Sequence, residues 1–453
     1  MLYLKELKKV MCSFFYILFA GALAVALYSQ GALYFGDSRM NRPEPGGNYG
    51  VVNREIPEMI MPAALESLWQ EFCENNYKTY PIGFIKNVRL DEKKQRMVAE
   101  IIAEITGEDT EAILGKQAAF EGTGDDGYSF NIGEELQMDS DGNLIFSGAR
   151  DGSEEEGKDT GEEGLTIAVR DDMEYGKFAE AMQRVDDILG GGSDYCAEHL
   201  KSYGTVEVTY EEAVQRHELA VSRDRITGGY ARLFSDYAVA MVMSLLPVFP
   251  AVILCLKDRR ARMAELIYTR EVSAARLTVV RYFALVTAAM LPVLLLSYVS
   301  NASVWGLYSG ERLDYLAPLK YDLGWIMPGV MMATAVGMFL TELTGTPIAV
   351  AVQGFWWLID INMGFRSVES GYALFRLAPR HNAGEKSFFR TQDYVDNFQR
   401  LVANRLLFAG LSAVLIIATI LIYERKRRGS LDGGSKIKRA LSVLGNRKNK
   451  LEG

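Results

Sequence analysis

The stretch Val10–Phe35, VMCSFFYILFAGALAVALYSQGALYF, contains no charged residue. A helix needs roughly 20 mostly apolar residues to cross a hydrocarbon core about 30 Å thick, and this stretch is long enough. The apolar part of a cleaved signal peptide is shorter, about 7–15 residues, and a small-x-small cleavage site follows it. A cleaved peptide is therefore the weaker alternative. We expect residues 1–35 to form a cytoplasmic N-terminus and a first transmembrane helix.

Further apolar segments fill the second half of the chain. Those that pass a hydropathy window for a membrane span are Tyr237–Leu256, Leu277–Val299, Leu323–Leu340, Thr346–Ile361 and Leu401–Tyr423. The third and fourth of these are short and only residues 341–345 separate them, so one re-entrant hairpin over 323–361 is the alternative to two spans. The sequence predicts an α-helical polytopic membrane protein with six transmembrane helices, five of them within residues 237–423.

The distribution of lysine and arginine orients these spans, because cytoplasmic flanks collect positive charge. Basic residues gather in three places: Lys5, Lys8 and Lys9; Lys257, Arg259, Arg260 and Arg262; and Arg425, Lys426, Arg427 and Arg428. Six crossings put all three places on the cytoplasmic side of the cell membrane, with both termini inside. The amphipathic loop 362–400 then lies outside. It is mildly basic, against the rule, but placing it inside would expel the basic tail 424–453.

The same topology places residues 36–236 outside the cell. This region holds 20 Lys and Arg against 42 Asp and Glu, in a chain whose net charge is −9. About 200 residues suffice to bury a core, and apolar spacing and turn residues predict both helices and strands. We expect an inserted α+β extracellular domain. Its predicted elements are helices at 62–75, 92–105, 178–189 and 210–219, a hairpin at 133–148, a solvated loop at 152–164 and a strand at 165–169.

Three motif-like spacings in this region do not carry chemistry. Gly152–Asp159 has the spacing of a phosphate-binding loop, but Asp159 replaces the Ser or Thr that holds magnesium and three glutamates would repel phosphates. Gly122–Gly127 matches a dinucleotide-binding pattern by spacing alone and is interpreted as a turn. Asp139–Asn143 lacks the Gly and the distal Glu of a calcium loop, so a hairpin turn is favoured. With three histidines in the chain, we predict no catalytic, cofactor or metal site and no enzymatic activity.

Four cysteines are too few for a disulfide framework, and Cys12 and Cys255 lie in or beside predicted spans. Cys73 and Cys196 share the outer domain, where both a bridge and two free thiols stay open. The basic tail suits anionic lipid headgroups, with a merely solubilising tail as the alternative. The net charge averages two sides of a membrane and gives no sign of a nucleic-acid partner.

Ionisable residues near the ends of the predicted spans can be accommodated by lipid headgroups. These residues are Arg281, Glu342, Asp360 and Arg405. The spans show no midplane acid or base, which argues against a proton relay or an ion pump and favours an amphipathic or large cargo. Prolines remove a backbone hydrogen bond and are expected to bend the spans that contain them. They are Pro247, Pro250, Pro292 and Pro328.

The connection between the second and third predicted spans, KDRRARMAELIYTREVSAARL (Lys257–Leu277), has an amphipathic pattern. Its apolar face carries Met263, Leu266 and Ile267, and charge surrounds that face. Periodicity alone is equally typical of an interfacial helix that only joins two spans. The combined pattern is more specific: a charged start, Glu-Leu-Ile at 265–267, and a Ser-x-x-Arg-Leu entry at 273–277 into the next span.

This combined pattern resembles the coupling-helix region of the type-2 ABC exporter permeases, where Glu-Leu-Leu, a small-residue turn and Ser-Arg lead into the next helix. The family's usual Pro before the Ser-Arg step is replaced here by Glu271-Val272. The resemblance covers the whole chain, since it includes six spans, both ends inside, a large outer insertion after the first span and an amphipathic piece before the last. The segments 188–193 and 208–213 are similar to the outer domains of permeases from Gram-positive gut bacteria.

The resemblance implies a permease subunit of an ABC exporter that moves a peptide, a lipid-linked molecule or another amphiphile outward. It implies a homodimer or a pair with a related permease, and a separate ATPase subunit that binds ATP and Mg²⁺ and docks beneath a coupling helix at 258–276. The residues expected to contact the ATPase are Arg262, Met263, Glu265, Leu266, Ile267 and Arg270. The alternative is a non-transporting membrane sensor or immunity protein whose extracellular domain binds a ligand or partner. A hydrolase is a distant third.

Overall fold

The computed structural model contains two compact units. The described residues are 1–33, 40–81, 84–121, 136–138, 144–146, 167–197, 199–260, 272–308, 310, 312–363, 368–381 and 389–428. The first unit comprises Met1–Asn53, Ile82–Phe84 and Thr205–Gly453, and the second comprises Arg54–Pro81 and Ile85–Gly204. Each unit has its own hydrophobic core, and each is described by itself below.

The N-terminal segment of the first unit is a bent pair of helices. Helices α1 (Leu2–Met11) and α2 (Phe14–Ser29) meet at an angle of 65°. The side chain of Ser13 caps α2 by accepting a hydrogen bond from the Tyr16 N–H at 3.2 Å, which explains why a new helix begins there. The apolar helix is therefore shorter than the predicted span and starts after the bend.

Four stretches among the described residues are helical and apolar enough to cross a membrane. They are Ala240–Lys257, which contains α9 (Ala240–Met243) and most of α10 (Val248–Arg260); α12 (Ala274–Leu307); Ala317–Thr344, which joins α13 (Ala317–Tyr321), the π-helical turn η3 (Asp322–Ile326) and α14 (Met327–Thr344); and α17 (Thr391–Arg427). The bent pair α1–α2 makes five if it is one span. Helix α15 (Ile348–Asn362) is apolar but has only 15 residues. These helices indicate a membrane protein, and the six spans stay a prediction.

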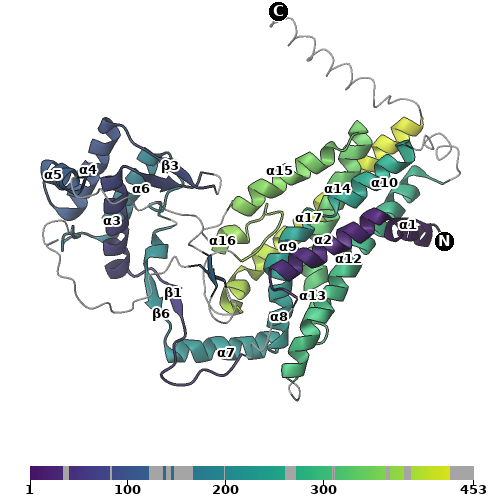
Figure 1. Cartoon of the computed structure of the whole chain (residues 1–453), viewed down its shortest axis with the longest axis horizontal. Coiled ribbons are helices and arrows are strands. Elements are labelled where there is room, and N and C mark those ends of the chain that lie inside the picture. Colours follow the sequence, from purple (N-terminus) through teal and green to yellow (C-terminus); the bar gives the residue numbers. More distant parts are fainter. Residues whose placement is uncertain are drawn as a thin grey trace, which may run out of the picture. The chain divides into compact units, whose positions relative to one another are not determined.

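Helix α14 is central to the first unit, because α10, α12, α15 and α17 all pack against it (Figure 1). The crossing with α10 is especially close. A Cβ added to Gly337 would lie 2.8 Å from the Ala251 Cβ and 3.2 Å from the Val248 carbonyl oxygen. Small residues allow such close approach of membrane helices. The prolines expected to bend the spans have different effects. Residues 244–247, which include Pro247, interrupt the helix just before α10, whereas α12 continues through Pro292.

Shorter elements complete the first unit. Strands β1 (Val51–Asn53) and β6 (Thr205–Glu207) pair antiparallel. They are followed by α7 (Tyr210–Asp224), α8 (Thr227–Leu233), the π-helical turn η2 (Phe234–Val239) and, further on, α16 (Val368–Gly371). A capping box between Thr209 and Glu212 starts α7, which confirms the helix predicted at 210–219. Residues 391–400, expected in the outer loop, are instead the first turns of α17.

The second unit is mainly helical. Its elements are α3 (Pro57–Glu74), β2 (Tyr77–Thr79), β3 (Lys86–Val88), α4 (Glu92–Thr106), α5 (Thr110–Glu121), β4 (Leu136–Met138), β5 (Leu144–Phe146), α6 (Tyr175–Leu189) and the 3₁₀ turn η1 (Leu200–Tyr203). Side chains from three helices, including Phe72, Ile102 and Phe178, are fully buried in its core. The strands form two antiparallel pairs, β2–β3 and β4–β5.

Most of the secondary-structure elements predicted for this part of the chain are confirmed in the second unit. Helices α3, α4 and α6 match the segments 62–75, 92–105 and 178–189, and the pair β4–β5 matches the hairpin. On α4, Val98 is fully buried, whereas Met97 is 42% exposed. The described part of the predicted strand, 167–169, is not a strand, and the loop 152–164 lies outside the described residues. Cys73 and Cys196, both described, are not joined by a disulfide.

Gly204 offers a test of packing in the second unit. Its φ of −87° suits any residue, but an added Cβ would lie 1.9 Å from the Arg54 carbonyl oxygen. We expect Gly204→Ala to destabilise this unit by about 1–3 kcal/mol through overpacking. Hydrogen-exchange mass spectrometry of the full-length protein would show faster exchange in α3 and α6. The control Gly176→Ala adds a methyl group with no atom within 4 Å on α6, so equal effects of both changes would contradict the prediction.

Candidate functional site

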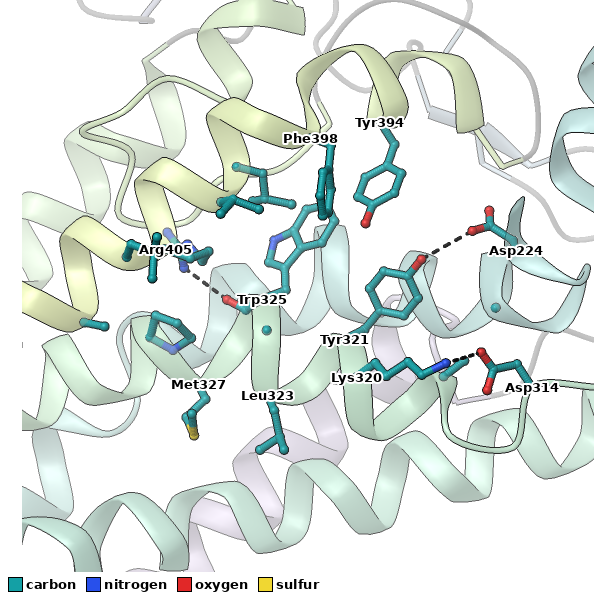
Figure 2. Close-up of a pocket in the computed structure, with 18 of the residues that line it drawn as sticks. Asp224, Asp314, Lys320, Tyr321, Leu323, Trp325, Met327, Tyr394, Phe398 and Arg405 are labelled. Atoms are coloured by element: carbon teal, nitrogen blue, oxygen red, sulfur yellow. Dashed lines mark hydrogen bonds and ion pairs between the residues drawn. The ribbon is translucent and has the colours of Figure 1, made fainter. Parts of the chain in front are cut away.

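A cavity of about 630 Å³ lies among α8, η3, α14 and α17 of the first unit (Figure 2). Its apolar wall comes mainly from one face of η3–α14 and one face of α17. The residues of this wall are Leu323, Met327, Met331, Phe398, Leu401, Val402, Leu406 and Ala409. Both helices are candidate membrane spans, so the wall lies within apolar helical surface. A cavity of this size and lining suits a small molecule with a substantial apolar part.

The opposite side of the cavity is polar. Figure 2 shows Asp224, Asp314, Lys320 and the hydroxyl of Tyr321 gathered away from Leu323 and Met327. Lys320 Nζ lies 2.6 Å from an Asp314 carboxylate oxygen, and the Tyr321 hydroxyl donates a hydrogen bond to Asp224 at 3.3 Å. The cavity therefore has a polar side and an apolar side, which is the arrangement that binds amphipathic molecules.

The polar side is held in place by a buried ion pair. Arg232 of α8 lies 2.9 Å from Asp224, the last residue of α7, and both side chains are at most 3% exposed. The same guanidinium donates to the Thr391 hydroxyl at 3.1 Å and sits 4.5 Å from the centre of the Tyr394 ring. A buried carboxylate is tolerated only with a paired cation and further hydrogen bonds, and both are present here. This pair joins α7, α8 and the start of α17.

Trp325 closes one side of the cavity. It is 2% exposed and stacks on Tyr394, with ring centres 5.9 Å apart and an angle of 12° between the planes. Its indole N–H donates to the Pro379 carbonyl at 2.9 Å, so the ring is held from both ends. The indole therefore links the cavity to the segment 368–381.

Arg405 brings a buried positive charge to the apolar wall. Its guanidinium donates to the Trp325 carbonyl at 3.1 Å, to the Arg376 and Leu377 carbonyls at 3.2 Å each, and to the Asn404 side-chain oxygen at 2.8 Å. These acceptors are carbonyl oxygens rather than carboxylates, so the described hydrogen bonds satisfy the donors without neutralising the charge. Arg405 therefore brings a cation to a cavity whose lining also includes the acids Asp224 and Asp314, and the Asp360 carboxylate acts on its charge.

The segment 368–381 is folded onto the helices by side chains of α15 and α17. Asp360 accepts hydrogen bonds from the backbone N–H groups of Leu377 at 2.8 Å and Ala378 at 3.1 Å. Asn404 donates from its amide to three backbone carbonyls between Ala373 and Arg376, at 2.8–2.9 Å. Asp360 is 5% and Asn404 0% exposed. Buried polar side chains here replace the backbone pairing that this irregular segment lacks.

The far end of this segment meets η2. The Asp236 carboxylate accepts a hydrogen bond from the His381 backbone N–H at 2.7 Å. Burial raises the pKa of Asp236 to about 6, although this N–H and nearby arginines oppose the rise. Burial and the charges of Arg390 and Arg232 lower the pKa of His381 to about 3, so this ring is neutral at neutral pH. The 3.6 Å approach of His381 to Asp393 is therefore not an ion pair at that pH.

The residues predicted to contact an ATPase, 262–270, lie outside the described residues. Two of the ionisable residues expected near span ends are paired: Arg281 lies 3.3 Å from Glu6, and Glu342 lies 3.7 Å from Lys426. The expectation that headgroups accommodate Asp360 and Arg405 is wrong, because these side chains are 5% and 6% exposed and are bound by protein groups.

Asp322 was missed by the sequence prediction. The predicted span began at Leu323, but the helical stretch extends back to Ala317 and brings this fully buried acid inside. The apolar residues Ala317, Pro318 and Leu319 on its N-terminal side were a signal for that extension. Among the described residues, no group of three His, Cys, Asp or Glu side chains is placed to hold a metal ion.

No family model, curated protein or solved structure matches this chain.

Replacing Arg405 tests its role at this site. We expect Arg405→Ala to free the carbonyls of Arg376 and Leu377 and to expose residues 368–381 to faster hydrogen exchange. Leaving several buried carbonyls unsatisfied costs about 1–3 kcal/mol each, so the effect should be local but large. The control is Arg400→Ala, an exposed arginine on the same helix. Unchanged exchange in 368–381 for Arg405→Ala would mean that the guanidinium does not hold the segment.

Proposed function

We propose that this chain is the membrane permease subunit of an ATP-driven ABC exporter and moves an amphipathic, peptide-like or lipid-like cargo across the cytoplasmic membrane. In this proposal residues 10–35, which include α2, form the first span and α15 the fifth of six, with both termini in the cytoplasm and residues 36–236 outside. A separate ATPase subunit binds ATP and Mg²⁺ and docks against the coupling helix 258–276. The permease works as a dimer with a second copy or a related chain.

The cavity between α14 and α17 carries this proposal. Its apolar wall, its polar side and the positive charge of Arg405 suit a molecule with an apolar body and an anionic head. The acids of the described lining are paired, Asp314 with Lys320 and Asp224 with Arg232. This pairing suits a site that binds a ligand.

Contacts among helix ends support the six-span topology. Glu342, at the end of α14, lies 3.7 Å from Lys426 at the end of α17. Arg427 donates to the Val272 carbonyl, just before α12, at 3.0 Å. The six-span topology needs all these ends on the cytoplasmic side, so their proximity agrees with it. The coupling helix would then adjoin the basic end of α17, where a cytoplasmic ATPase can reach it.

The second candidate is a membrane sensor or immunity protein that binds a ligand without transporting it. One observation favours it: Arg223 and Asp224, at the end of α7, line the cavity, so a bound ligand would act directly on a helix outside the candidate spans. Both candidates share the cavity. They differ in whether an ATPase associates with the chain.

Affinity purification from native membranes in mild detergent, with mass spectrometry and an ATP-hydrolysis assay, tests the permease proposal. We expect a stoichiometric ATPase with the wild type, and its loss with Glu265→Lys plus Leu266→Asp, because the double change reverses a charge and removes an apolar contact at the coupling helix. The matched control is Asp396→Lys, a charge reversal at an exposed residue near the opposite end of α17. An ATPase that stays bound to the double variant would remove these residues from the interface. A signalling partner in place of an ATPase would favour the sensor.

Filling the cavity tests the ligand site separately from the ATPase. We expect Ala409→Trp to weaken binding of lysophosphatidylglycerol, an anionic amphiphile, about tenfold, which corresponds to about 1.4 kcal/mol. Native mass spectrometry of the protein in a neutral detergent measures this binding. Ala403→Trp places the same ring on an exposed position of α17 and should leave binding unchanged. Equal binding by both variants would show that lipid does not enter this cavity.

A further inference from the structure

Asp322 is an acid buried inside a candidate membrane span. It is the first residue of η3, in the stretch Ala317–Thr344, and its side chain is 0% exposed. A second π-helical turn, η2, packs against η3 and brings Ser235, whose hydroxyl lies 3.3 Å from an Asp322 carboxyl oxygen. Turns of π-helix are rare and occur frequently at functional sites. Two of them thus meet at one buried carboxyl.

A third element contributes oxygens to the same place. Ser297 of α12 faces the Asp322 carboxyl and is 0% exposed. The two groups lie near each other, but by distance and angle neither the second Asp322 oxygen nor the Ser297 hydroxyl forms a hydrogen bond with any described residue. Asn301 follows one helical turn after Ser297, and its side-chain oxygen also has no described partner, although its amide donates to the Ser297 carbonyl at 2.9 Å. The second carboxyl oxygen of Asp322 and the Ser297 hydroxyl are thus buried without a formed hydrogen bond.

The environment supplies no described positive charge to Asp322. Besides burial, the groups that act on its carboxyl are the two hydroxyls of Ser235 and Ser297. Other buried acids of the first unit are compensated differently: Asp224 pairs with Arg232, Asp360 accepts two backbone N–H groups, and Asp236 accepts the His381 N–H and is acted on by arginines. An ionised carboxyl buried in a membrane span requires a compensating cation.

We propose that Asp322, Ser235 and Ser297 form an intramembrane binding site for a sodium ion. Carboxylate and hydroxyl oxygens are hard ligands that suit hard cations. One carboxylate neutralises one positive charge, so a monovalent ion fits the site better than Ca²⁺ or Mg²⁺, which take several carboxylates or waters. Sodium sites in membrane proteins are built in this way where spanning helices lose their regular α-helical form.

The sodium site and the cavity share one π-helical turn. Tyr321, Leu323 and Trp325 line the cavity, whereas Asp322 between them faces Ser235 and Ser297. A ligand that shifts this turn must change the affinity for sodium, and sodium must change the affinity for the ligand by the same factor. The sodium-site proposal assumes that Ala317–Thr344 crosses the membrane, but it does not require an ATPase partner. It can therefore be tested separately from the permease proposal.

Thermal unfolding and ²²Na⁺ binding of the purified full-length protein test this site. At constant ionic strength, replacing choline chloride with NaCl should raise the Tm of the wild type by about 5 °C when sodium is at about 100 times its Kd. Asp322→Asn, which keeps the shape and removes the charge, should abolish both the sodium-dependent rise and ²²Na⁺ binding. The matched control Asp396→Asn changes an exposed acid on α17 and should behave as the wild type.

A second pair of variants keeps the test informative if Asp322→Asn fails to fold. Ser297→Ala should weaken ²²Na⁺ binding about tenfold or more. Ser303→Ala, on the same helix, removes a hydroxyl already bonded to the Ser300 carbonyl and should not weaken it. A wild-type Tm that is independent of sodium would overturn the proposal. So would a Tm that depends on pH alone, which would make the carboxyl a proton site, or ²²Na⁺ binding that survives in Asp322→Asn.

Discussion

The buried guanidinium of Arg405 is the constraint on which the first unit depends. It lies in an apolar helix, and its donors are satisfied by carbonyls of η3 and of the segment 368–381 together with Asn404. Losing any of these acceptors would leave charged donors buried without partners. The position of α17, the path of the irregular segment and the shape of the cavity are thereby fixed together. Asp360 strengthens the arrangement by holding the same segment through its N–H groups.

Charge inside this unit is compensated in several ways, and function follows from the differences. Asp224 is neutralised by a direct ion pair with Arg232, which gives the cavity a rigid polar side. Arg405 is solvated by carbonyls, and in the proposed function it contacts the anionic head of the ligand. Asp322 has only hydroxyls among its described neighbours and therefore calls for a mobile cation. The first unit thus combines a permanent ion pair, a permanent positive charge and, in our proposal, a site for an exchangeable cation.

Hydropathy predicted the positions of α12 and α17 well, because both helices carry apolar side chains along their whole middle sections. It missed the bend at Ser13, since the apolar run continues across it and only the serine cap marks the break. The segment 368–381 was expected as an outer loop. Its true role could not be read from local pattern, because Asn404 and Asp360 lie far from it in sequence and the contacts exist only in the folded chain. Asp322 was left out of the predicted span because an acidic residue lowers the mean hydropathy of a window. The predicted span therefore began after Asp322, although the helical stretch continues through it.

The close crossing at Gly337 has a mechanical consequence. A Cβ added to that glycine would lie 2.8 Å from the Ala251 Cβ and 3.2 Å from the Val248 carbonyl oxygen, so α10 and α14 cross too closely for a larger side chain. We expect the two helices to move together. The irregular turn at 244–247, just before α10, is the nearest place where the backbone can absorb a change of direction. A force applied at the end of α10 is therefore delivered to α14, and through it to the cavity wall and to the turn that carries Asp322.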